Sequence, residues 1–268
     1  MTKKIATGFR AQRIPAAAAI MLLLALAASC AQKSTTTPPQ TQKQTPPQVQ
    51  QTPPPQPAKI TLNGEEMGTT ADLSGLEQFL KKVMQGREKQ GVIREGTDEI
   101  ERTVFVRVEP SLKLAEVLKV IQAVTEAGAS PVKLPVRANV KDDERVMPKL
   151  TLAVSVGEVK PEVGDFLDGM PIRYLQNSPV SREEKDFLGE TYITIEMRRD
   201  GEYIVNEKPV AKSALSGELQ ARLKEPKDKI LLVLVEKDSQ ISYASLADVA
   251  QAAFDAHAEG LQLNTLAP

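Results

Sequence analysis

Few side chains of this 268-residue chain have types and spacing that could do chemistry. His257 is its one histidine, and no cysteine or pair of carboxylates lies at ligand spacing from it, so a solvated or helix-capping imidazole is favoured over a metal ligand or catalytic base. Ser216 lacks the glycine two positions earlier that a nucleophile elbow requires, and there is no glycine-rich phosphate loop. The charged run at residues 141–145 indicates a solvated loop rather than a cation site. The sequence therefore predicts that the protein is not an enzyme, with no catalytic, cofactor-binding or metal-binding residue.

Cys30 is the only cysteine, which excludes an internal disulfide. It follows Ala27, Ala28 and Ser29 at the end of the apolar run 14–28, and basic residues precede that run. This resembles a bacterial lipobox, in which residues 1–29 are a signal peptide that is removed and diacylglycerol is attached to the sulfur of Cys30. The alternatives are an ordinary secretory signal cut near Ala28 and an uncleaved anchor, although a run of about 15 residues is shorter than the ~20 that span a bilayer.

Residues 31–58 contain eight prolines and eight glutamines, with too few apolar side chains to offset the entropy of ordering. We predict that residues 30–58 are a lipidated cysteine followed by a disordered tether, which the Pro-Pro pairs stiffen toward polyproline II. At ~3.1 Å per residue the tether would reach about 85–90 Å, enough to hold a folded domain away from a lipid surface.

Residues 229–266 predict a strand, a helix and a second strand. Residues 230–235 are apolar and β-prone, as in a strand buried on both faces. Ser242 is expected to cap the helix by accepting a hydrogen bond from its first turn, and Gly260 to supply the left-handed stop. Residues 261–265 then alternate as in a half-buried strand, so a right-handed crossover between parallel strands is expected.

The same pattern occurs earlier in the chain. Residues 104–127 align without a gap with residues 233–256, at an offset of 129 positions, and residues 60–63 align with residues 203–206 at an offset of 143. The 14-residue difference indicates an insertion in a polar loop expected at residues 85–102. The sequence therefore predicts two tandem copies of one small α+β domain.

The segment between the copies, residues 138–186, is predicted to be irregular with one extra strand at residues 150–156. Ser181 and Glu184 fit a capping box that would start one short helical turn. The first copy has no strand before Ile60, and the extra strand is able to fill the edge that this leaves empty.

Each copy resembles the periplasmic domain of the ExbD/TolR family of biopolymer-transport proteins, over residues 59–137 and 187–268. In the second copy the resemblance rests on residues 191–196, 200–201, 203–206, 215–224, 230–235 and 238–243, and in the first on residues 62–64, 73–83 and 104–114. Leu114 stands where the family favours tyrosine, and Glu207 where it favours glycine. The resemblance implies an α+β fold of two small β-β-α-β-α-β domains.

The resemblance also implies contact with partner proteins or cell-wall polymer, often as a dimer, and a membrane helix whose acidic residue couples to proton flow. Residues 1–29 contain no Asp or Glu. We therefore expect a lipid-anchored periplasmic binding or scaffold protein, accessory to an ExbD/TolR-type transport or envelope-maintenance system, with Ala31 favouring the outer membrane. The alternative is an inner-membrane stator subunit whose N-terminal anchor stays uncleaved. A net charge of −1 argues against a nucleic-acid partner.

An open sheet has edge strands that can pair with another chain. Residues 261–266 contain no proline and no charge, so we expect them to form such an edge, together with whichever strand borders Ile60. Association by strand addition, as a homodimer or with an extended segment of an envelope protein, would then use Leu261, Leu263 and Thr265. Tyr243, an aromatic residue expected to be partly exposed at a helix start, is a further candidate contact, although packing of its ring under the preceding loop is favoured. Alternatively, the strand at residues 150–156 and the two copies themselves cover these edges.

Overall fold

The computed structural model describes residues 56–137, 150–157, 168–175, 179–224, 229–236 and 240–267. The predicted signal segment, Cys30, the tether up to residue 55 and the charged run at 141–145 lie outside these residues. In chain order the elements are β1 (Lys59–Leu62), β2 (Glu65–Thr69), α1 (Ser74–Gln90), β3 (Val104–Val108), α2 (Leu114–Glu126), β4 (Val132–Val136), β5 (Thr151–Ser155), β6 (Asp168–Tyr174), α3 (Arg182–Thr191), β7 (Ile193–Arg199), β8 (Glu202–Val205), β9 (Lys208–Ala211), α4 (Lys212–Arg222), β10 (Ile230–Glu236), α5 (Tyr243–Asp255) and β11 (Gly260–Leu266).

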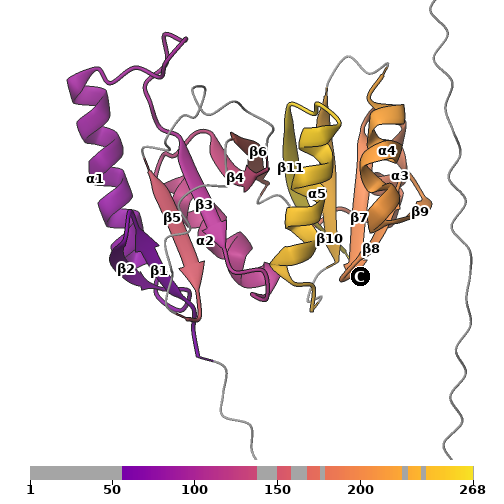
Figure 1. Cartoon of the computed structure of the whole chain (residues 1–268), viewed down its shortest axis with the longest axis horizontal. Helices are drawn as coiled ribbons and strands as arrows, with labels where there is room; N and C mark the ends of the chain where they lie inside the picture. Colours follow the sequence, from indigo (N-terminus) through magenta and orange to yellow (C-terminus); the bar gives the residue numbers. More distant parts are fainter. Residues whose placement is uncertain are drawn as a thin grey trace, which may run out of the picture. The chain divides into compact units, whose positions relative to one another are not determined.

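The strands of the described residues form one mixed sheet in the order β2-β1-β5-β3-β4-β6-β11-β10-β7-β8-β9 (Figure 1). The first repeat contributes β1 to β5 with α1 and α2, and the second contributes β7 to β11 with α4 and α5. Both repeats combine helices with antiparallel and parallel strand pairs, so the predicted α+β class is confirmed.

The predicted duplication is visible in the boundaries of the elements. α2 and α5 begin and end 129 positions apart, and β1 and β8 begin and end 143 positions apart. In each repeat the helix crosses between parallel strands, from β3 to β4 and from β10 to β11. Val233 and Leu234 are fully buried in β10, which confirms the central strand predicted there.

β5 takes the place in the first repeat that β7 takes in the second. β5 pairs antiparallel with β1 and parallel with β3, just as β7 pairs antiparallel with β8 and parallel with β10. β5 comes last in its repeat whereas β7 comes first, so the two repeats are circular permutations of one arrangement. The extra strand thus fills the position that the first copy lacks before Ile60, and this position is interior rather than an edge.

Two equivalent asparagines fix this pairing. Asn63 donates its backbone N–H to the carbonyl of Thr151 (2.8 Å) and accepts the N–H of Thr151 on Oδ1 (2.9 Å). Asn206 makes the same two bonds with Thr194, at 3.0 and 2.8 Å. Both asparagines have positive φ, as the first residue of a two-residue hairpin turn requires.

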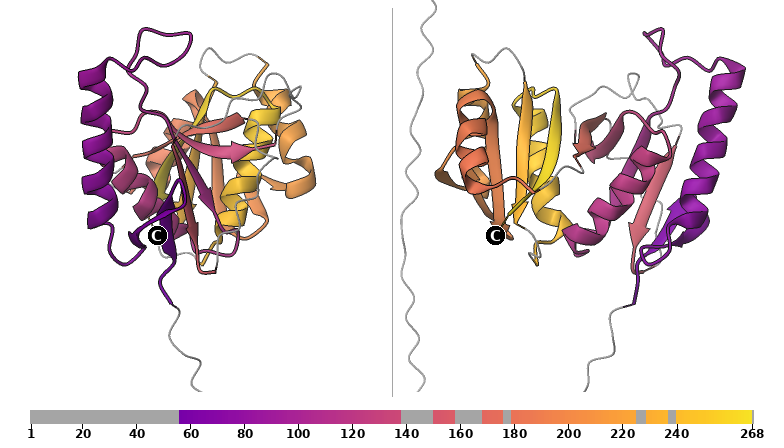
Figure 2. Two further views of the ribbon diagram at one scale, coloured as in Figure 1. Left: turned by 60° about the vertical axis from the view of Figure 1, so that its left-hand side comes forward. Right: turned by 180° about the vertical axis from the view of Figure 1, so that it is seen from behind.

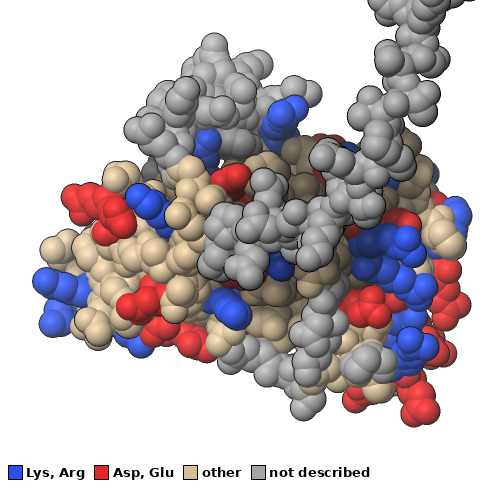
Figure 3. Space-filling view, turned by 90° about the horizontal axis from the view of Figure 1, so that it is seen from below, with Lys and Arg blue, Asp and Glu red and all other residues tan. Residues whose placement is uncertain are grey.

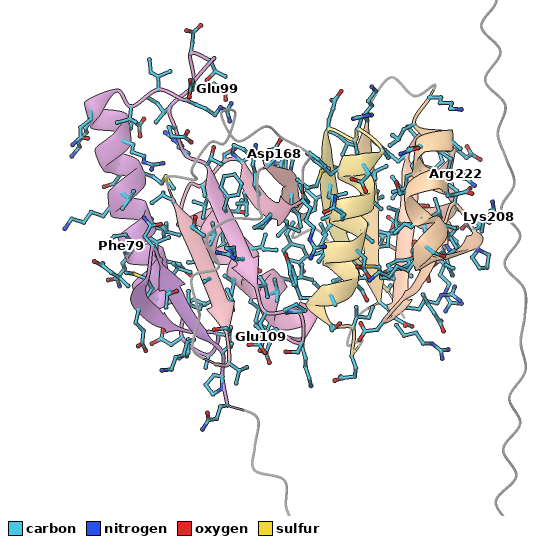
Figure 4. All side chains as sticks on the ribbon, in the orientation of Figure 1. Phe79, Glu99, Glu109, Asp168, Lys208 and Arg222 are labelled. Carbon is cyan, nitrogen blue, oxygen red and sulfur yellow. The ribbon has the colours of Figure 1, made fainter. Side chains whose placement is uncertain are left out.

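The carboxylate of Glu109, which follows β3, ties down the far end of β5. It accepts hydrogen bonds from the Ser111 hydroxyl (2.7 Å) and the Val156 N–H (2.9 Å), and these bonds lower its pKa (Figure 4). β5 is therefore anchored at both ends by side chains of the first repeat.

β6 joins the two repeats and covers the strand that was expected to be an edge. It pairs antiparallel with β4 and parallel with β11, so residues 261–266 lie between β10 and β6. The prediction that this strand is an unpaired edge is wrong, because a second strand of the connecting segment covers it. Gly260 lies close to Pro171, and a Cβ at position 260 would make a tight contact of 3.3 Å with the Pro171 carbonyl oxygen.

The actual edges of the sheet are β2 and β9. β2 carries Glu65 and Glu66, and β9 contains Pro209, which has no N–H to offer a pairing strand. Lys208 of β9 and Arg222 of α4 both contact Glu218, at 2.7 and 2.9 Å, at the outer end of the second repeat (Figure 4). Short, charged or proline-containing edges such as these discourage strand addition.

The two faces of the sheet are covered differently. Alternate residues of β10 divide between a large core, which includes Leu231 and Val233, and a small cluster of Val180, Leu232, Leu234 and Leu266. α4 and α5 pack on the large core, and α3, which lies behind the sheet in Figure 1 and in front in the right-hand view of Figure 2, packs on the small cluster through Leu188. No helix among the described residues covers the same face in the first repeat.

Three local predictions need correction. α1 continues to Gln90 and ends at Gly91 with positive φ, so the start of the expected loop at 85–102 is helical. The capping box of Ser181 and Glu184 is present, but it starts a helix of ten residues rather than one turn. The left-handed residue after α5 is His257 and not Gly260.

Candidate functional site

The two repeats meet at the N-terminal ends of α2 and α5. Leu114 donates its N–H to the carbonyl of Ile241 (2.8 Å), and Tyr243 donates its N–H to the carbonyl of Leu112 (2.7 Å). The two donors, Leu114 and Tyr243, are 129 positions apart, and so are the two acceptors, Leu112 and Ile241. Exchanging the two repeats therefore converts one hydrogen bond into the other. A contact in which residue i meets j and j meets i is the signature of a two-fold interface. The chain therefore contains a pseudo-symmetric pair of domains at this junction.

Asp200 holds the start of α5 in place of the expected cap. Its Oδ1 accepts hydrogen bonds from the N–H and hydroxyl of Ser242 (2.8 and 2.9 Å) and from the hydroxyl of Ser245 (2.9 Å). Ser242 is at the N-cap position, but its hydroxyl donates to Asp200 rather than accepting from the helix. The bond from the Ser242 N–H lowers the pKa of Asp200, so the carboxylate stays charged beside the positive end of the helix.

The residues predicted to contact partners lie largely inside the molecule. Tyr243 is buried in the large core, and this burial raises its pKa, so the expected partial exposure is wrong. Leu261 and Leu263 are also buried, whereas Thr265 is half-buried. Because β6 pairs with β11, this strand has no free edge that could bind another chain. Contact of these side chains with a partner stays a prediction.

A groove of about 720 Å³ lies at the seam between the repeats, where β4, β6 and β11 run side by side. It is bordered by Arg102, Arg173 and Glu259. Arg102 also contacts Glu88 (3.3 Å), and its Nε is buried without a hydrogen-bond partner. The charges at this groove are mixed, and Lys, Arg, Asp and Glu are likewise interspersed among the described residues on the face that Figure 3 shows.

A second groove, of about 520 Å³, runs between α3 and the face of β10 and β11 that carries the small cluster; we call it the α3 groove. Phe187 and Tyr192 border it and are 70% and 37% exposed. α3 is held to the sheet by Lys185, which contacts the buried carboxylate of Glu196 at 3.4 Å, and Arg198 contacts the same carboxylate at 2.7 Å. Burial alone would raise the pKa of Glu196, but these two cations outweigh it and lower the pKa.

The structure shows where the one histidine of the chain lies. His257 is exposed and donates its backbone N–H to the carbonyl of Phe254 (2.9 Å), so it closes the end of a helix. Among the described residues no three His, Cys, Asp or Glu side chains gather as a metal site would require, and no helix is long and apolar enough to cross a membrane.

The sequence reasoning missed Asp200, Glu196 and the paired roles of Asn63 and Asn206. The two asparagines occupy the same aligned position before a turn, and that coincidence could have identified them. Asp200 and Glu196 have no such signal, because their partners Ser242 and Lys185 lie in other elements.

The comparison with protein families agrees with the two-repeat architecture. The family model described as biopolymer transport protein ExbD/TolR matches residues 15–139 and 171–267. No curated protein and no solved structure matches the chain significantly. The family match covers more than half of the chain, in two segments that correspond to the two repeats. The chain therefore belongs to the ExbD/TolR family of biopolymer-transport proteins of the cell envelope.

Proposed function

We propose that this chain is a lipid-anchored binding and scaffold protein, accessory to an ExbD/TolR-type transport or envelope-maintenance system, with no catalytic role. The observation that carries the proposal is the junction between α2 and α5, where two family domains pair reciprocally within one chain. Proteins of this family work in membrane complexes with partners. A chain that supplies both members of a domain pair brings a preassembled surface to such a complex and needs no second copy to form it.

The anchor proposal rests on Cys30 and on the residues before it. The apolar run 14–28 ends in Ala27-Ala28-Ser29-Cys30, and residues 1–29 contain no acidic residue that could couple to proton flow. A lipidated Cys30 at the periplasmic face of a membrane, with the outer membrane favoured by Ala31, is the arrangement that fits these residues. The partners would be an envelope protein or cell-wall polymer, without nucleic acid.

One observation favours the second candidate, an inner-membrane stator subunit with an uncleaved anchor. The family match begins at residue 15, inside the apolar run, rather than at the start of β1. In this alternative the run would remain in the membrane.

Mass spectrometry of the mature N-terminus separates the two candidates. A chain that begins at Cys30 and carries the mass of a lipid supports the lipoprotein, and a chain that retains residues 1–29 supports the stator. Cys30→Ala should block processing or release the protein from membranes. If Cys30→Ala is processed and fractionates like the parent, the lipid anchor is excluded.

A further inference from the structure

The α3 groove has aromatic side chains that no described element covers. Phe187 has the largest exposed fraction among the large apolar side chains exposed in the described residues, and Tyr192, the residue that follows α3, lines the same groove. Leu232 lines the groove from β10. Exposed apolar surface beside a groove marks a place where another segment binds.

The polar groups of the groove indicate which kind of segment would fit. Gln262 and Asn264 of β11 bring side-chain amides, which can donate hydrogen bonds to backbone carbonyls. An aromatic groove with such donors suits polyproline II, because that conformation leaves its carbonyls unpaired and loses little entropy on binding.

A carboxylate at one end of the groove adds a preference for positive charge. Glu184 borders the groove at the start of α3, and its hydrogen bond from the Ser181 N–H lowers its pKa, so it carries a negative charge at neutral pH. Glu184 and Tyr192 are eight positions apart, or about 12 Å along a helix, which matches about four residues of polyproline II. The groove therefore fits a short proline-rich segment with a basic residue at one end.

The chain itself contains a segment of this chemistry. Residues 43–55 read Lys-Gln-Thr-Pro-Pro-Gln-Val-Gln-Gln-Thr-Pro-Pro-Pro, and residues 31–55 contain two lysines and no acidic residue. We propose that the α3 groove binds residues 43–55 of a second copy of this chain, with Pro46 and Pro47 against Phe187 and Tyr192 and Lys43 toward Glu184. Copies held at one membrane would meet at raised effective concentration, which favours a contact of this size.

This contact differs from the strand addition expected from the sequence. It joins two different surfaces, a proline-rich segment and a groove, so each copy could bind one neighbour and be bound by another. The edges β2 and β9 are not needed for it. The proposal depends on neither lipidation nor the partner system, so it can fail while the proposed function stands.

Sedimentation velocity of the Cys30→Ser chain without residues 1–29, over a wide concentration range, tests the proposal. We expect reversible association that Phe187→Ser weakens by more than about tenfold, as for an aromatic anchor. Phe79→Ser on α1 is the matched control, because Phe79 is as exposed as Tyr192 but lies in the other repeat (Figure 4), and it should leave association unchanged. A synthetic peptide of residues 42–55 should dissociate the parent, and the same peptide with Pro46→Ala and Pro47→Ala should not.

Circular dichroism of each variant identifies any loss of folding, and Tyr192→Ser serves as a second groove variant. A chain that stays monomeric at all concentrations overturns the proposal. Association that is equally strong in Phe187→Ser and Tyr192→Ser, or that the peptide does not reduce, also overturns it, because the second copy would then bind elsewhere.

Discussion

The two repeats place equivalent strands in equivalent positions but cover the sheet differently. Leu234 of β10 and Phe105 of β3 are 129 positions apart and lie on the same relative face. Leu234 is fully buried beneath α3, whereas Phe105 is half-buried, with Lys133 5.7 Å from its ring and no described helix above it. The repeats thus share the core that makes the fold, and they differ on the face that remains for other contacts.

The same difference is visible in polar residues. Glu196 of β7 and Ala153 of β5 occupy equivalent positions, two residues after Thr194 and Thr151. Glu196 binds α3 through Lys185, and Ala153 instead borders a groove of about 950 Å³ on the face of the first repeat. The ion pair between Lys185 and Glu196 therefore accompanies α3, and the described part of the first repeat has no helix on this face.

Substituting a buried residue of the sheet by a charged one should have the largest effect, and it tests most directly how differently the two repeats are covered. Leu234→Asp is expected to cost more than about 4 kcal/mol of unfolding free energy, and Val233→Asp a similar amount, because each buries an unpaired charge. Phe105→Asp should cost about 1–2 kcal/mol, since its side chain can reach water. Urea unfolding of the three variants measures these losses. Equal losses in Leu234→Asp and Phe105→Asp would mean that the first repeat is covered on this face as well.

The ion pair beneath α3 should make stability depend on pH. Because the pKa of Glu196 is lower in the folded chain than its ordinary 4.5, its contribution is present above that pH and is lost as pH falls below it. Glu196→Gln should cost about 1–3 kcal/mol at pH 7, since Lys185 loses its buried partner, and should reduce the loss of stability on acidification. Denaturant titrations of both proteins between pH 7 and pH 3 test this. A parallel decline of parent and variant would assign the acid sensitivity to other carboxylates.

Substitutions in the two hairpin turns should change stability least, and the two substituted positions are equivalent in the two repeats. Glu207 has a φ of 68°, and Gly64 holds the equivalent place in the first repeat with a φ of 91°. Glu207→Gly should stabilise the protein by about 1 kcal/mol because it removes backbone strain, whereas Gly64→Ala should destabilise it by a similar amount. Thermal unfolding of the two variants would show opposite shifts in Tm. A lower Tm in Glu207→Gly would indicate that its side chain makes a stabilising contact.

The sequence predicted the repeated units well because their signals are local. Six apolar residues in 230–235, the spacing of apolar residues in 243–254 and the constant offset of 129 all concern neighbours in the chain. Each of these elements is in the structure, and the class of the fold followed from them.

The assembly of the strands was harder to predict, because it depends on pairings between distant residues. β6 contains Gly169 and Pro171, which read as turn residues, yet it forms the strand between β4 and β11. Gly169 is needed because a Cβ there would lie 2.7 Å from the Phe105 ring. The expectation of an edge at residues 261–266 was wrong for this reason, and with it the proposed exposure of Leu261 and Leu263.

The position of β5 has a consequence for the order in which the chain can fold. During synthesis β1 to β4 are made first. β1 and β3 do not pair with each other, and the strand that joins them, β5 at Thr151–Ser155, is made only later. The second repeat has β7 and β8 at its beginning, so its strands can pair in the order of their appearance. The N-terminal repeat is thus the one that must wait, and its sheet stays open until β5 has been made.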